Sequence, residues 1–137
     1  MGAVATFLAL PGSDRRLLLG ALATIVRVRA GLRLQSIEPL KTWAQQPGTG
    51  NVPAGRLAWA ARIAARRLHG TTCLASALAL QRLLSQHGHV SELHIGVARQ
   101  GPSFAAHAWL MHRGEIVIGA EQHEEFTQLV AWPSNPG

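Results

Sequence analysis

The first half of the chain repeats its apolar residues with the spacing of an α-helix. Asp14 can cap a helix over residues 15–34, which has an apolar face and a face rich in arginine. A short helical piece is expected at 40–45, before a loop rich in Pro and Gly. Another helix is expected from near Pro53 to Leu68. The N-terminal half is therefore predicted to be helical.

A further helix is predicted to begin at Cys73. Thr71 and Thr72 precede it, and a threonine oxygen can accept from the N–H groups of a first helical turn. Leucine and alanine cover nearly every side of this segment, and Gly88 is a natural C-terminal cap. A helix that is apolar all round is a buried one, so we expect it at the centre of the fold.

Beyond this helix the hydrophobic period changes from about four residues to two. Apolar and polar residues alternate over 93–97, a second strand is expected at 104–111, and a hairpin turn leads to a third at 115–118. Helices followed by a strand meander predict an α+β domain, in which a small antiparallel sheet packs against the helix carrying Cys73.

Length and composition favour one folded unit. The chain has 137 residues, of which 47% are hydrophobic, and contains no low-complexity tract. We predict a single domain over 1–137, with a helical N-terminal part (1–52), a core that carries the candidate chemistry (53–131) and a flexible tail (132–137).

The net charge of +6 can attract nucleic acid, an anionic membrane surface, or an acidic protein or peptide, and the charge alone does not choose among them. The basic residues include two arginine pairs, Arg15 with Arg16 and Arg66 with Arg67. Nucleic acid is not expected as a partner, because the few aromatic residues do not alternate with the basic ones as a stacking surface requires. A solvated arginine face on the helices is the simplest interpretation.

The cysteine content and the apolar runs bear on location. One cysteine excludes an internal disulfide, and a free thiol suits a reducing compartment, so the cytoplasm is expected. The apolar run at 17–26 is too short for a transmembrane segment, and no cleavage site of small residues follows it.

Cys73 and His107 are the candidate catalytic pair. A thiol at a helix start meets unpaired N–H groups and the positive end of the helix dipole, which favour the thiolate. A histidine on a following strand can exchange the proton. A buried structural cysteine is the alternative. No metal site or cofactor is expected. His87, His89 and His94 could imitate a metal cluster, but the chain has no second cysteine and these histidines lack the paired spacing of a structural zinc site.

An ordered set of motifs around these two residues resembles a known family. Its pieces are Cys73-Leu74, Ser76-Ala77-Leu78-Ala79-Leu80, Leu83-Leu84, Gly88, Leu93-His94-Ile95-Gly96-Val97, Phe104 and Ala106-His107-Ala108-Trp109-Leu110. Residues 65–129 thus resemble the leader peptidases of lasso-peptide biosynthesis, in the transglutaminase-like cysteine superfamily. The resemblance implies a transglutaminase-like or papain-like core in which Cys73 and His107 are catalytic.

The third catalytic residue departs from the family pattern. The resemblance implies an aspartate about a dozen residues after His107, near Gly119, but the only aspartate is Asp14. If the third strand continued regularly, Glu121 would share a sheet face with His107, so Glu121 is the favoured candidate. Glu115 lies beside the turn, and Gln122 or a backbone carbonyl are the other options.

The resemblance implies removal of the leader from a lasso precursor peptide. Proteins of this length in that family work with a small leader-recognition protein and an ATP-dependent macrolactam cyclase, and the arginine-rich helices offer a docking face. Two alternatives stay open. One is transglutaminase-like amide transfer on another peptide, and the other is a catalytically idle peptide-binding module.

Overall fold

Helices precede all of the strands in the structure, a computed structural model that describes residues 2–100, 103–119 and 127–133. The helices are α1 (Gly2–Ala9), α2 (Gly12–Leu34), α3 (Ile37–Ala44), α4 (Ala54–Arg67) and α5 (Cys73–Gln86). The strands are β1 (Glu92–Gln100), β2 (Ser103–His112), β3 (Glu115–Ile118) and β4 (Thr127–Pro133). The predicted α+β class, with helices first and an antiparallel sheet after them, is confirmed.

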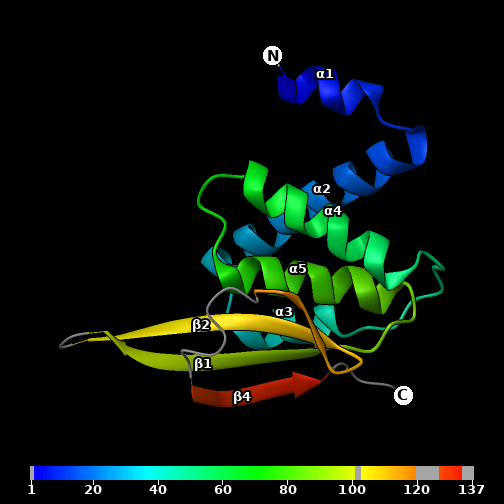
Figure 1. Cartoon of the computed structure of the whole chain (residues 1–137). Helices are drawn as coiled ribbons and strands as arrows, with labels where there is room; N and C mark the ends of the chain where they lie inside the picture. The colour runs from blue at the N-terminus through cyan, green and yellow to red at the C-terminus, as the bar shows by residue number, and fades with distance from the viewer. Residues whose placement is uncertain (1, 101–102, 120–126, 134–137) are drawn as a thin grey trace.

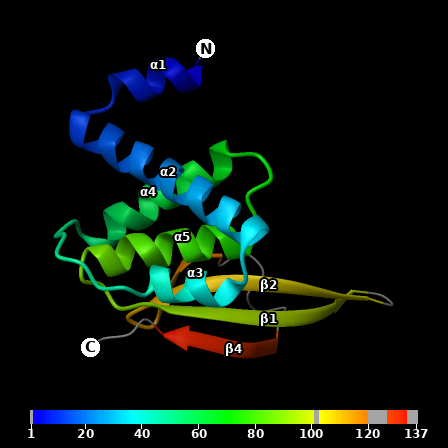
Figure 2. The ribbon, with the colours of Figure 1, turned by 180° about the vertical axis from the view of Figure 1, so that it is seen from behind.

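The helices lie on one side of the sheet, as the two opposite views in Figure 1 and Figure 2 show. Helix α5 lies next to the strands, α2 and α4 cover α5, and α1 lies farthest from the sheet. Ten of the fourteen residues of α5 are buried, which agrees with the prediction of a central helix. The residue that begins this helix is Cys73, so the most buried helix of the fold presents the only cysteine.

The long helix α2 packs through one face. Its buried residues Leu18, Ala21, Ile25 and Val28 recur every three or four positions, as an amphipathic helix requires. No helix among the described residues is long and apolar enough to span a membrane.

The sheet has the strand order β3-β2-β1-β4, and its paired strands are antiparallel. Strands β1 and β2 form a hairpin in which Leu93 is opposite Leu110 and Gly96 is opposite His107. Leu93, Ala108 and Leu110 belong to the core beneath the helices. Because side chains alternate along a strand, His107 and Trp109 point to the opposite face of the sheet.

Two elements lie outside the predicted pattern. Helix α1 and strand β4 were not predicted, and β4 includes Trp132 and Pro133, which the sequence analysis assigned to the tail. Residues 134–137 lie outside the described ranges. The remaining helices and strands fall within three residues of their predicted limits.

Candidate active site

Cys73 occupies the first turn of α5, and Thr72 caps that turn. The hydroxyl oxygen of Thr72 accepts from the Ala75 N–H at 3.1 Å, and its carbonyl accepts from the Ser76 N–H at 3.0 Å. The predicted capping role of Thr72 is therefore confirmed. The N–H groups of Cys73 and Leu74 precede the first helical hydrogen bond, so the helix start offers backbone donors beside the thiol.

The sulfur of Cys73 lies against the backbone of β2. It accepts a hydrogen bond from the Ala108 N–H at 3.3 Å. The N–H and C=O of one residue in an antiparallel strand point to the same side. The Ala108 carbonyl lies beside Gly119, just past the end of β3, since a Cβ on Gly119 would be 2.7 Å from that oxygen. The sulfur therefore lies at the edge of β2 that faces β3, where β3 has ended.

His107 directly precedes the residue that binds the sulfur. Its Nε2 is 2.8 Å from the carbonyl oxygen of Gly119. A carbonyl only accepts, so Nε2 carries the proton in this contact and Nδ1 is the basic nitrogen of the neutral ring. The contact thus fixes the tautomer that a general base needs.

The imidazole of His107 belongs to a row of three rings on the outer face of the hairpin. Its ring centroid is 5.9 Å from that of Trp109, with planes 25° apart, and His94 stacks on the same indole at 5.7 Å and 17°. Trp109 is only 3% exposed and His94 only 8%. The His94 Nε2 is 3.2 Å from a carboxylate oxygen of Glu92. Stacking therefore restricts the imidazole plane of His107, while Gly119 restricts its rotation.

The acceptor on His107 is a backbone group at the position where the resemblance implies an aspartate. The parity that favours Glu121 holds only if the third strand runs on past Gly119, but β3 ends at Ile118 and Gly119 has a φ of 88°. Glu121 and Gln122 lie outside the described residues, so the role of Glu121 stays a prediction. Glu115 is paired with His112 at the hairpin turn, five residues along β2 from His107.

Two of these contacts were not predicted, namely the hydrogen bond from the Ala108 N–H to the sulfur and the stacking of His94 on Trp109. The Ala108 N–H carries no side-chain signal, so residue types could not reveal it. The His94 stack did leave a signal, because a turn at 100–103 places His94 opposite Trp109 in a regular hairpin.

The histidines near the end of α5 have structural partners. The Nδ1 of His87 accepts from the Val52 N–H at 3.1 Å, and His89 Nε2 is 2.7 Å from the Val52 carbonyl. His112 Nδ1 is 2.7 Å from the Val90 carbonyl. Within the described residues, no three His, Cys, Asp or Glu side chains gather as a metal site would require.

Comparison with protein families gives one match. The model of the family described as the transglutaminase-like superfamily matches residues 14–131, a span that runs from α2 into β4 and includes both Cys73 and His107. Comparisons with curated proteins and with solved structures find no significant match.

Proposed function

Because the chain belongs to the transglutaminase-like superfamily, we propose that it is a cysteine peptidase that removes the leader from a lasso-peptide precursor. The superfamily supports thiol acyl-transfer chemistry. The lasso precursor as substrate rests on the resemblance of residues 65–129 to leader peptidases. On this proposal, the protein works in the cytoplasm with a leader-recognition protein and an ATP-dependent cyclase.

One observation carries the chemical part of the proposal. The Cys73 sulfur accepts from the N–H of Ala108, the residue next to His107, and Gly119 holds His107 Nε2. Cys73 lies on the helix side of the sheet and His107 on its outer face, but Ala108 and Gly119, which hold them, are neighbours at the edge of β2, and we propose that sulfur and imidazole meet there. Nucleophilic catalysis requires such a helix-start thiol and a histidine of fixed tautomer to come within reach of each other.

The proposed reaction has two acyl-transfer steps. Nδ1 of His107 takes the thiol proton, and the thiolate of Cys73 attacks the carbonyl carbon of the scissile peptide bond. The Cys73 N–H donates to the oxyanion. The imidazolium then gives its proton to the leaving amine, and a thioester remains. Water, deprotonated by the same nitrogen, hydrolyses the thioester and restores the thiol.

Glu121 remains the proposed carboxylate of the site. It follows Gly119 by two residues, and Gly119 already contacts the imidazole. If a carboxylate there stabilises the imidazolium, Glu121→Ala lowers the cleavage rate strongly, and Glu121→Gln retains more activity because an amide oxygen still accepts. Equal activity of Glu121→Ala and wild type would show that catalysis does not need this carboxylate.

Mass spectrometry of a lasso precursor incubated with this protein and the leader-recognition protein tests the proposal. Hydrolysis places one oxygen from heavy-oxygen water on the released leader, and Cys73→Ala abolishes the product. His107→Ala removes activity, while His112→Ala, a histidine on the same strand, leaves it near the wild-type rate. Cleavage by Cys73→Ala would refute the proposal.

Amide transfer is the second candidate function, and the same experiment separates it from hydrolysis. The superfamily and the site chemistry fit an amine acceptor as well as water. With a primary amine present, a transferase would give a product that carries the amine in place of the heavy oxygen. A peptide-binding module without catalysis would give neither product.

A further inference from the structure

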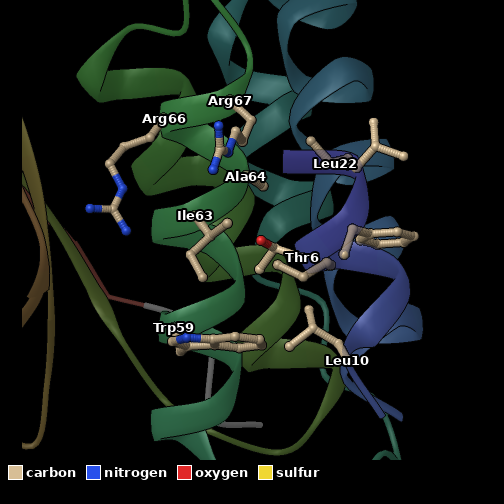
Figure 3. Close-up of a pocket in the computed structure, with 11 residues that line it drawn as sticks. Thr6, Leu10, Leu22, Trp59, Ile63, Ala64, Arg66 and Arg67 are labelled. Carbon is tan, nitrogen blue, oxygen red and sulfur yellow. The ribbon is translucent and has the colours of Figure 1, made fainter. Parts of the chain in front are cut away.

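An apolar groove of about 700 Å³ lies between α1, α2 and α4, on the helical side of the molecule. Its apolar lining includes Phe7, Leu10, Leu18, Leu22, Trp59 and Ile63. Figure 3 shows Thr6 of α1 and Leu10, the residue just after α1, on one wall, facing Trp59 and Ile63 of α4 on the other. A groove of this size and lining can take several apolar side chains of a peptide.

The charges of the groove lie at one end. Its only charged lining residues are Arg66 and Arg67, in the last turn of α4. Both are exposed, and no carboxylate of the described residues lies within 4 Å of either guanidinium. In Figure 3 Arg66 extends from α4 on the side away from α1, and Arg67 lies above Ala64. An occupant with carboxylates at this end would complement the groove.

The charged end of the groove is close to the candidate nucleophile along the chain. Arg67 and Cys73 are six positions apart in the chain, so their Cα atoms are at most about 21 Å apart. An extended peptide of about six residues can span such a distance.

We infer that this groove binds the recognition segment of the peptide substrate, with apolar side chains between α1 and α4 and carboxylates at Arg66 and Arg67. This inference rests on the proposed peptidase function and specifies the chemistry of its substrate. This limit on the distance to Cys73 favours the peptide substrate as the occupant. A second copy is disfavoured because this chain carries a net charge of +6.

Affinity labelling of the intact protein tests the inference. The probe is an amphipathic Leu/Glu peptide with a chloroacetamide on a Gly/Ser linker of about nine residues, whose root-mean-square length is roughly 16 Å. The Cys73 sulfur displaces chloride, and intact mass reads one site because the chain has no other cysteine. We expect labelling about tenfold faster than by free chloroacetamide at equal concentration, or by a matched Leu/Lys probe at low salt.

Charge reversal distinguishes binding in the groove from general attraction between the basic protein and the acidic probe. The double variant Arg66→Glu with Arg67→Glu should prefer the Leu/Lys probe, while Arg33→Glu keeps the wild-type preference. Arg33 is the matched control because it is exposed on α2, eleven residues beyond the groove residue Leu22, or about 16 Å along the helix. Ile63→Gln should slow labelling by both probes without changing the rate with free chloroacetamide.

Each contrary outcome overturns a definite part of the account. Equal labelling by both probes, or an unchanged preference in the Arg66 and Arg67 variant, would refute the charged groove. Tight binding of the Leu/Glu probe by fluorescence polarisation without faster labelling would refute a substrate occupant and favour a separate protein. A thiol inert even to free chloroacetamide would refute the proposed peptidase, while polarisation would still test the groove.

Discussion

The carbonyl oxygen of Gly119 lies 2.8 Å from Nε2 of His107 and holds the imidazole in one tautomer. This position is close to where the superfamily pattern implies an aspartate side chain. A backbone carbonyl accepts the same proton without carrying a full charge. The position of Gly119 depends on a backbone turn with φ of 88° and on close contact with β2.

Gly119→Ala should damage both stability and catalysis. An added Cβ would lie 2.7 Å from the Ala108 carbonyl oxygen, a backbone atom that cannot turn away, and Ala resists this positive φ. We expect a loss of about 2–5 kcal/mol in the free energy of unfolding, and a fall in cleavage rate. Urea denaturation and the cleavage assay measure the two effects.

Gly114→Ala is the matched control for this variant. Gly114 has a φ of 79°, but no atom lies within 4 Å of its built Cβ. It should lose only about 1–2 kcal/mol and retain the cleavage rate. If the two variants behave alike, the contact of Gly119 with β2 has no special importance.

Thr72→Ala should loosen the helix start that carries Cys73. The variant removes the hydroxyl that accepts from the Ala75 N–H, which costs about 1 kcal/mol of stability. Thr42→Ala is the control, because the Thr42 hydroxyl only donates to the Glu38 carbonyl within α3, where Ala is the better helix former. A greater stability loss in Thr42→Ala than in Thr72→Ala, measured by thermal unfolding, would contradict the capping role.

The sequence predicts most of the elements because their signals are local. Periodicity places the helix that begins at Cys73, and the turn at 112–114 places β3 at its observed residues. Strand β4 was missed because its pairing with β1 is a contact between distant segments, with an irregular register at Ile95 and Gly96. Such pairing is decided by tertiary packing and not by local propensity.

The candidate site was likewise predictable only in part. Cys73, Thr72 and His107 were identifiable because their side-chain types and positions carry the signal. The acceptor on His107 was assigned to a side chain by parity, which holds only in a regular strand. The positive φ of Gly119 interrupts that regularity, and a backbone acceptor has no residue type by which a sequence can reveal it.

Trp109→Ala should remove the ring on which the imidazoles of His94 and His107 stack. The indole is 3% exposed and stacks on His107, so its removal should cost about 3–5 kcal/mol and lower the cleavage rate. Trp109→Phe keeps an aromatic ring at the same position and should recover part of both losses.

His94→Ala is the companion test, because His94 stacks on the same indole as His107. We expect cleavage close to the wild-type rate, since His94 lies opposite Trp109 in the hairpin, whereas the residue opposite His107 is Gly96. A loss as large as that of His107→Ala would place His94 within the catalytic machinery.

Acid should destabilise the protein partly through His87. Burial, together with the positive charge of nearby His89, lowers the pKa of His87 below its ordinary value near 6.5. The unfolded chain then binds the proton more readily than the native state. This contribution to stability is therefore complete above about pH 6.5 and is lost as the pH falls below it.

The measurement for His87 is the midpoint of urea unfolding as a function of pH. His87→Gln should flatten the fall in stability below about pH 6.5, although it also weakens the contact with the Val52 N–H at all pH values. His69→Gln, at an exposed histidine, should leave the wild-type slope. An identical slope in wild type and His87→Gln would rule out this contribution.

The rate of alkylation of Cys73 by iodoacetamide at neutral pH tests the central claim most directly, because it requires no substrate. Intact mass follows a single thiol. If His107 acts on the sulfur, His107→Ala should slow alkylation about tenfold or more, since a free thiol is only a few per cent ionised near pH 7. His112→Ala should react like wild type. Equal rates in wild type and His107→Ala would contradict the Cys73 and His107 pair.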